Sequence, residues 1–264
     1  MRKSEKLTVG LKTKARAIAK VALLAGAISA TIPLQAQFNL DNVVKSAKKV
    51  AGAATVSDGE IIATFGQMSD KMDQENPIAT GKDPYAQRLA KLTQGLSNYD
   101  GLNLDIKAYR VKDVNAFAMG DGTVRVFAGL MDGFNDDEVR CVIGHEIGHV
   151  KLEHSKKRMK GALQQDAALS VASTASGSVS QIANSELGKL FGQVVNAQYS
   201  QKDETSADDY ALQFMRNNRY NIQGCVSAMD KLATLSGGGG KGVALLQTHP
   251  SPESRAKRMR QKLT

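Results

Sequence analysis

Cysteine is scarce in this sequence. Among 264 residues only Cys141 and Cys225 are present, and two thiols in a chain of this length do not make the disulfide framework of a small secreted scaffold. Whether they form one disulfide or stay as buried thiols is open, because their distance in space decides it and the sequence does not give that distance. No cysteine lies directly after the apolar run at residues 21–38, so we expect no lipid attachment there.

Long apolar runs are also lacking. Residues 21–38 are uncharged, but they are short for a transmembrane helix, which needs about 20 apolar residues. Residues 161–196 are rich in Ala, Ser, Gly and Gln. Polar and charged side chains interrupt this second segment at Asp166, Gln181, Asn184 and Glu186. We therefore expect it to form a soluble helix and not a membrane span.

The basic charge is concentrated at the start of the chain. Residues 1–20 hold seven Lys or Arg and one Glu, so the rest carries only +3 of the formal net charge of +9. This basic segment, the apolar run after it and the small residue Ala36 before Gln37 are typical of a secretory signal peptide. We predict a signal peptide over residues 1–36; an interfacial amphipathic helix and an uncleaved anchor are the alternatives.

The remaining chain lacks the basic surface of nucleic-acid-binding proteins. Such a surface needs Lys and Arg gathered on one face, preferably in a recognisable module. The basic residues at 156–158, with Lys151 and Lys160 nearby, fit the solvated side of a helix. We expect no nucleic-acid partner.

The patterns along the chain favour helices, then strands, then helices. Residues 38–98 have a helical pattern, with amphipathic stretches at 57–75 and 84–96. Residues 102–111 alternate apolar and polar side chains, and 115–130 contain two short apolar runs around Gly-Asp-Gly-Thr, a hairpin signal. We expect an α+β fold, mostly helical, with a small antiparallel or mixed sheet.

Histidine is rare and unevenly distributed. Three of the four histidines, His145, His149 and His154, lie within ten positions on a segment that returns to a helical period. Asn135 and Glu138 resemble a capping box at the start of this helix. His154 is rotated by about 140° from His149 on a continuous helix, so we expect packing or a hydrogen bond at the helix end for it, and not metal binding.

The other two clustered histidines predict a zinc site. His145 and His149 are four residues apart, so they project from one helix face and can bind one ion. Imidazole nitrogens suit Zn²⁺, and Glu146 completes the pattern HExxH, in which the carboxylate can take a proton from bound water. Two histidines can share a helix by accident. The surrounding positions are apolar, however, and uncompensated polar groups would be costly there.

A third ligand is expected on the helix at 200–215. Glu204 and Asp208 are four residues apart and share a face. One of them can bind the metal while the other holds a ligand histidine through its second nitrogen. Catalytic zinc usually takes three protein ligands and leaves one position for water.

Longer motifs then resemble a known family. HEIGH at 145–149 is followed 55 residues later by ETSAD, an instance of ExxAD at 204–208, and the pair resembles the M48 zinc metalloendopeptidases. The segments at 113–132, 198–212 and 249–259 are similar to soluble, exported members of that family. Together these segments span most of residues 84 to 260, in the family's order.

The resemblance implies roles for individual residues. His145, His149 and Glu204 would bind one Zn²⁺ per chain, and Asp208 would hold a ligand imidazole in the productive tautomer. Glu146 would be the general base and then the general acid.

The resemblance also implies two features of substrate handling. His249 resembles a late histidine that stabilises the oxyanion, with Arg255 beside it; the alternative is a loop residue before Pro250. An edge strand that includes Asn115, Ala116 and Phe117 would bind an extended peptide through main-chain hydrogen bonds.

These patterns together predict a zincin-like, gluzincin-type fold and a division into three parts. Residues 1–36 form the signal peptide, 37–83 an N-terminal helical segment and 84–264 the peptidase domain. Steric latency through 37–83 or through the glycine-rich loop at 236–242 stays open, and so does a plain linker role for that loop.

We expect a zinc-dependent endopeptidase in a bacterial periplasm or cell envelope, acting on exported polypeptides that are unfolded or misfolded. A zinc-stabilised holdase or assembly factor that binds extended segments is the alternative, although Glu146 favours catalysis. Peripheral membrane association and the oligomeric state stay open.

Overall fold

The computed structural model describes residues 57–170, 194, 196–237 and 243–263, which all belong to one compact unit, Leu40–Thr264. Four segments with predicted structure or function lie outside the described residues: 1–36, 37–56, 171–193 and 238–242. Among the described helices, none combines the length and the apolar character that a membrane span needs.

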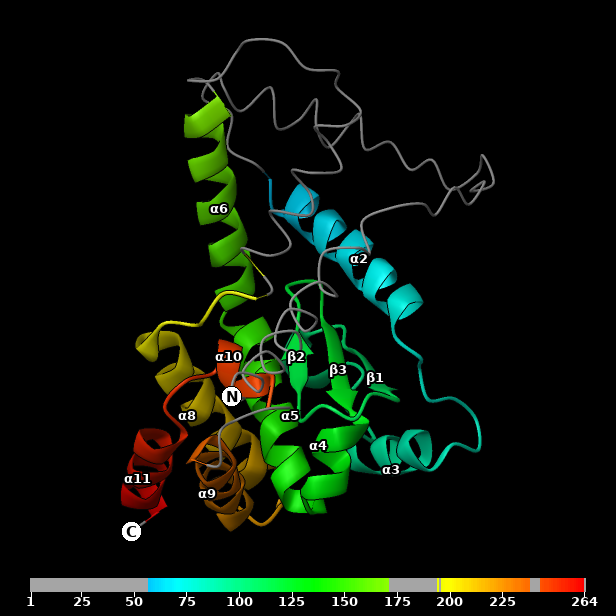
Figure 1. The fold of residues 1–264 in the computed structure, drawn as a ribbon, viewed down its shortest axis with the longest axis vertical. Helices are drawn as coiled ribbons and strands as arrows, with labels where there is room; N and C mark the ends of the chain where they lie inside the picture. The colour runs from blue at the N-terminus through cyan, green and yellow to red at the C-terminus, as the bar shows by residue number, and fades with distance from the viewer. Residues whose placement is uncertain (1–56, 171–193, 195, 238–242, 264) are drawn as a thin grey trace, which may run out of the picture. The chain divides into compact units, whose positions relative to one another are not determined.

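The elements follow in the order shown in Figure 1. They are α2 (Asp58–Glu75), α3 (Pro84–Leu92), η2 (Tyr99–Gly101), β1 (Asp105–Tyr109), β2 (Ala116–Ala118), β3 (Thr123–Phe127), α4 (Ala128–Gly133), α5 (Asp136–Lys151), α6 (His154–Ser170), α8 (Gln201–Asn217), α9 (Gln223–Gly237), α10 (Leu245–Thr248) and α11 (Pro252–Leu263). The expected α+β fold, mostly helical with a small sheet, is confirmed.

The described strands form one mixed sheet in the order β1-β3-β2. β1 is parallel to β3, and β2 is antiparallel to β3 through the predicted hairpin. Gly122 has φ +95 in the turn, and a Cβ there would lie 1.9 Å from the carbonyl oxygen of Asn103. This position therefore requires glycine. β2 is left as an edge strand among the described residues.

The helical pattern predicted for 38–98 is correct in two stretches and wrong between and after them. α2 matches the stretch at 57–75 closely, and Asp83 caps α3 by accepting a hydrogen bond from the Tyr85 amide. α3 ends at Leu92, earlier than the predicted Leu96, and the chain then turns through Gly95 at φ +82. A left-handed glycine ends helices readily.

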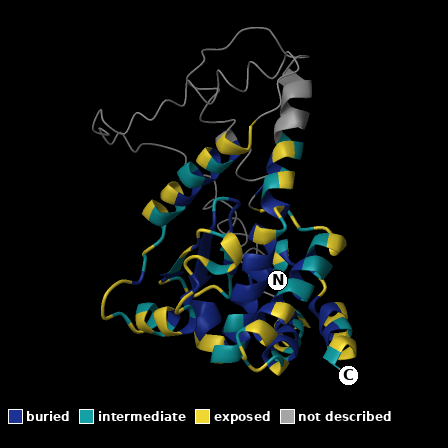
Figure 2. Ribbon diagram, turned by 180° about the vertical axis from the view of Figure 1, so that it is seen from behind, coloured by how far each residue is buried: buried dark blue, intermediate teal, exposed yellow. Residues whose placement is uncertain are grey.

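Helix α5 lies at the centre of the described unit. The predicted capping box is present: Asn135 Oδ1 accepts from the Glu138 amide, and Glu138 Oε2 accepts from the Asn135 amide. Figure 2 shows the burial of the helices, and in α5 every residue from Cys141 to Val150 is buried. The helix contacts the sheet on one side and α8 and α9 on the others.

Two glycines in the histidine motif allow α5 and α8 to pack closely. A Cβ on Gly144 would lie 2.5 Å from the Phe214 ring, and one on Gly148 would lie 3.2 Å from the Cα of Ala207. Both distances are too short for a larger residue without movement of α8. The glycines around the histidines are thus required by packing.

The open question about the cysteines is decided in favour of a disulfide. Cys141 on α5 and Cys225 on α9 are bonded, with their Cα atoms 5.2 Å apart. Both residues are buried. The disulfide fixes the middle of α5 to α9, one turn before His145.

Candidate metal centre and active site

Two turns of α5 present the first two metal-binding candidates. His145 and His149 lie on one face with their Nε2 atoms 2.9 Å apart, and both are buried. Burial is the largest influence on His149 and holds its pKa well below the ordinary value of 6.5. A neutral imidazole keeps a lone pair free, which is the form that a metal ligand needs.

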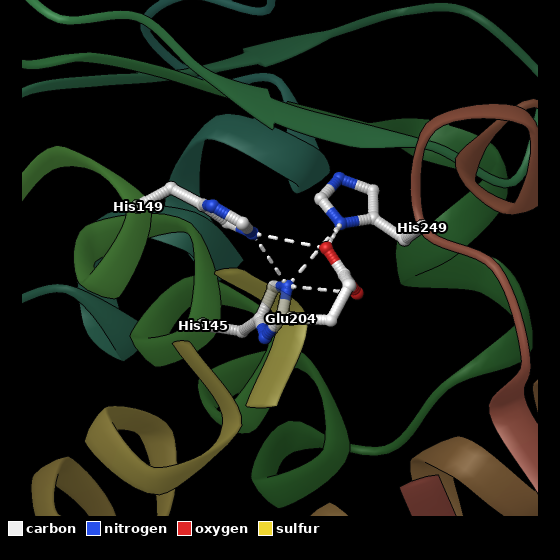
Figure 3. Close-up of side chains that lie close together, drawn as sticks. All are labelled: His145, His149, Glu204 and His249. Atoms are coloured by element: carbon white, nitrogen blue, oxygen red, sulfur yellow. Dashed lines mark hydrogen bonds and ion pairs between the residues drawn. The ribbon is translucent and has the colours of Figure 1, made fainter. Parts of the chain in front are cut away.

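Helix α8 and the residue after α10 add two more donors. Glu204 places Oε1 3.3 Å from His149 Nε2 and Oε2 3.7 Å from His145 Nε2. His249 places Nδ1 2.9 Å from Glu204 Oε1. One donor atom from each of the four residues lies within 4.8 Å of the other three (Figure 3). Two imidazoles and a carboxylate are a donor set of catalytic zinc sites, so these residues fit such an ion.

The second nitrogen of His145 is held by α8. Ser200 and Asp203 form a capping box that starts this helix, and Glu204 and Asp208 follow on its buried face. Asp208 Oδ1 lies 3.0 Å from His145 Nδ1. A carboxylate at this nitrogen fixes the orientation of the ring and leaves Nε2 to face the metal position.

Arg255 of α11 compensates the buried carboxylates. It donates to Asp208 at 3.0 Å through Nε and at 2.6 Å through Nη2, and its Nη1 lies 2.5 Å from Glu204 Oε2. Burial alone would raise the pKa of Asp208, but the charge and hydrogen bonds of Arg255 and the contact with His145 together outweigh it and lower that pKa. Arg255 thus pairs with the buried carboxylates of Asp208 and Glu204.

His154 contacts the other candidate ligand, His149, which the sequence did not indicate. The expected hydrogen bond is present, but its partner is a metal-ligand candidate: Nδ1 of His154 lies 2.9 Å from Nδ1 of His149. On a continuous helix the side chains of His149 and His154 would point in different directions. α5 instead ends at Lys151, and Glu153 at φ +59 turns the chain so that His154 faces back.

An aromatic stack also supports His149. The ring of Tyr199 lies 3.7 Å from the His149 ring at an interplanar angle of 26°, and the guanidinium of Arg158 lies 3.7 Å from the Tyr199 ring centre. The Tyr199 hydroxyl is 2.9 Å from Ser155 Oγ. No periodicity could have indicated this stack, because Tyr199 precedes α8 and Arg158 lies on α6.

The carboxylate of Glu146 lies in a buried environment, and neither of its oxygens has a hydrogen-bond partner among the described residues. The nearest cation candidate is His249, with Nε2 3.5 Å from Oε1. Both side chains line a cavity of about 20 Å³, roughly the space of one water. A larger hollow, of about 330 Å³, lies at Asn135 and Asn221 and holds none of the site's side chains.

The predicted substrate strand lies beside this cavity, which Phe117 and Ala118 help to line. Asn115 accepts a main-chain hydrogen bond from Phe127, so it faces β3. Because main-chain groups alternate in an antiparallel pair, those of Ala116 and Ala118 face the open edge.

Comparison with known proteins gives a family match. The model of peptidase family M48 matches residues 86–263. Two Escherichia coli (strain K12) proteins are similar over most of their length. Metalloprotease LoiP is 36% identical over 248 residues, which are 93% of this chain and 98% of LoiP. Metalloprotease YcaL is 38% identical over 212 residues, which are 80% of this chain and 83% of YcaL.

A solved structure gives a fold match. The crystal structure of Ste24p from S. mikatae superposes with a TM-score of 0.50 at 16% identity, over 83% of this chain and 62% of that one. At this identity the likeness shows the fold alone, and it confirms the expected zincin-like architecture. The chain belongs to peptidase family M48 and is a metalloendopeptidase.

Proposed function

We propose that the chain is a zinc-dependent endopeptidase that hydrolyses extended polypeptides, with Glu146 as its general base. The observation that carries this proposal is the buried carboxylate of Glu146, which has no hydrogen-bond partner among the described residues and lies next to the four clustered donors. A buried carboxylate without hydrogen bonds is costly, and a metal together with a water would compensate it.

The proposed ligands are His145, His149 and Glu204. A metal bound there would supply a Lewis acid that activates water and polarises the scissile carbonyl. Asp208 orients His145 through Nδ1. Burial itself would raise the pKa of Glu204, but the neighbouring histidines, His249 first and then His145 and His149, together outweigh it and lower that pKa.

We assign proton transfer to Glu146 and stabilisation of the oxyanion to His249. Glu146 takes the proton of the attacking water and passes it to the leaving nitrogen. His249 faces Glu146 across the small cavity, and we assign it to the charge that develops on the scissile oxygen. Because its Nδ1 also lies among the ligand atoms, the same ring is within reach of the metal position.

The main chain of the edge strand would hold the substrate. An extended peptide can pair with Ala116 and Ala118, whose groups face away from β3. Asn115 and Phe117 would then position that edge, since their own main-chain groups pair with β3. A folded protein cannot offer a free strand, so we propose unfolded or misfolded polypeptides as substrates.

Location and domain division are part of the same proposal. The pattern of residues 1–36 supports export as a signal peptide, and the two similar proteins named above are bacterial. We place the chain in a bacterial periplasm or cell envelope. The peptidase domain is 84–264, and α2 belongs to the preceding segment 37–83.

The test is cleavage of unfolded casein by the chain from residue 37 onward. Glu146→Gln should reduce cleavage by about 100-fold or more with no loss of bound zinc, because only the base is removed. Glu253→Gln is the matched control, since Glu253 is exposed, and it should cleave as the unaltered chain does. Equal cleavage by both variants would reject the mechanism. Retained zinc and peptide binding without any cleavage would favour the binding-factor alternative.

A further inference from the structure

Helix α2 packs beside the β2–β3 hairpin through a hydrophobic cluster of its own. The buried members of this second cluster come from α2, the β2–β3 hairpin, α6 and one residue near α8: Ile61, Phe65, Met68, Met119, Met159 and Val194. No described residue of α2 belongs to the main core around α5. α2 can therefore leave its position without opening the core that supports the metal ligands.

Phe65 of α2 reaches the catalytic cavity. Its side chain lines the cavity together with Glu146 and His249. The ring sits against Gly120 of the hairpin, where a Cβ would come within 2.6 Å of it. With Phe65 in place the cavity measures about 20 Å³, which has room for roughly one water and none for a peptide.

The two ends of α2 are held unequally. Near its C-terminal end, Asp73 accepts hydrogen bonds from Tyr109 at 2.6 Å and from buried Arg125 at 2.8 Å. At its first residue, Asp58 pairs with Lys160 of α6 at 2.7 Å, and both side chains are exposed. Exposed ion pairs contribute little to stability, so the first turn is held more weakly than the last.

We propose that α2 is a built-in cover that competes with substrate for the site. Phe65 occupies the space that a large apolar side chain of an extended substrate would take. Movement of α2 about its Asp73 end uncovers Phe117, Met119 and Met159, an apolar wall whose methionines adapt to different partners. This inference rests on the proposed function, and the closed form lowers apparent substrate affinity by the fraction of molecules that are open.

The first test weakens the contact between α2 and the hairpin by a substitution on each side of it. Phe65→Ala removes the ring, and Gly120→Ala fills the ring's seat without changing α2. Each should raise kcat/KM on unfolded casein by about fivefold or more, with bound zinc unchanged. Ile62→Ala is the matched control, because Ile62 lies on the same helix outside both described clusters. Unchanged kcat/KM in both Phe65→Ala and Gly120→Ala would overturn the cover.

The second test follows α2 directly and does not depend on turnover. Amide hydrogen exchange is measured on Glu146→Gln with an unstructured Ala/Ser peptide that carries one Phe, and with its twin in which Ser replaces that Phe. The Phe peptide should speed exchange across residues 58–75 by about fivefold or more and the Ser twin should not, while α5 stays protected. Binding of the Phe peptide with unchanged exchange in α2 would overturn the cover and leave the peptidase intact. Absence of both cleavage and peptide binding would overturn the proposed function and the cover with it.

Discussion

The helices that carry the proposed metal ligands and the helix proposed to cover the site are attached in different ways. α5 is fixed to α9 by a disulfide and to α8 by glycine contacts, and Arg255 of α11 neutralises the buried carboxylates of α8. α2 is attached through a separate apolar cluster, hydrogen bonds of Ser69 to the hairpin, the Asp73 anchor and one exposed ion pair. From this difference in attachment we expect the proposed ligands to keep their positions when α2 moves and changes access to the site. Substitutions in the two regions should therefore have different consequences.

The largest expected effect is loss of the buried cation. Arg255→Met leaves Asp208 and Glu204 buried without their positive partner, and it should lower the free energy of unfolding by about 3–5 kcal/mol. Urea unfolding measures this. Arg260→Met removes a similar pair with Asp230 on the surface and should change stability by about 0.5 kcal/mol or less. Equal losses in both variants would show that burial does not distinguish the two pairs.

The disulfide should come next. The double variant Cys141→Ala, Cys225→Ala opens a loop between residues 84 positions apart and should cost about 2–4 kcal/mol in unfolding free energy. Unfolding of the unaltered chain in excess reductant should show the same loss, and reductant should not affect the variant. A variant as stable as the unaltered chain would mean that the disulfide does not hold α5 in place.

The contact of His154 with His149 should increase the affinity of the site for zinc. His154→Ala removes the group at His149 Nδ1 and should weaken zinc binding by about 10- to 100-fold, as measured by chelator competition. Lys157→Ala, at an exposed position three residues further on, is the control and should bind zinc normally. Equal zinc affinity in the two variants would leave His154 as a packing residue only.

The anchor of α2 should give the smallest effect, and one that depends on pH. Burial opposes the charge of Asp73, but hydrogen bonds from Arg125 and Tyr109 outweigh it and lower its pKa to about 2. A carboxylate with a lowered folded pKa stabilises the fold above its unfolded pKa near 4 and loses this contribution as pH falls toward 2.

The measurement compares metal-free unaltered chain with metal-free Asp73→Asn in urea. The difference in unfolding free energy should be on the order of 2 kcal/mol at most above pH 5 and should shrink between pH 4 and pH 2. A difference that stays constant down to pH 2 would contradict an ionised anchor.

Local signals predicted the parts of the fold and site that depend on neighbouring residues. The Gly-Asp-Gly turn gave the hairpin, and Asn135 with Glu138 gave the start of α5. The four-residue spacings brought together His145 with His149, and Glu204 with Asp208, because each pair lies on one regular helix.

Contacts that form where a helix ends, or between segments far apart in the chain, could not be predicted from the sequence. His154 contacts His149 because the helix between them ends, which a wheel drawn on a continuous helix cannot show. The stack of Arg158 on Tyr199 joins α6 to the segment that precedes α8. The cysteine pair likewise depends on how α9 packs on α5, and the position of α2 depends on side chains far along the chain.

The most direct test of the account is metal content measured together with hydrolysis on the same samples. The chain from residue 37 should carry one zinc per molecule, lose casein cleavage when a chelator removes it and recover cleavage when zinc is returned. His149→Ala should lose both zinc and cleavage, because it removes one of the three proposed ligands. A chain that cleaves casein without bound metal, or that keeps its zinc in His149→Ala, would contradict the assignment of this cluster as the catalytic metal centre.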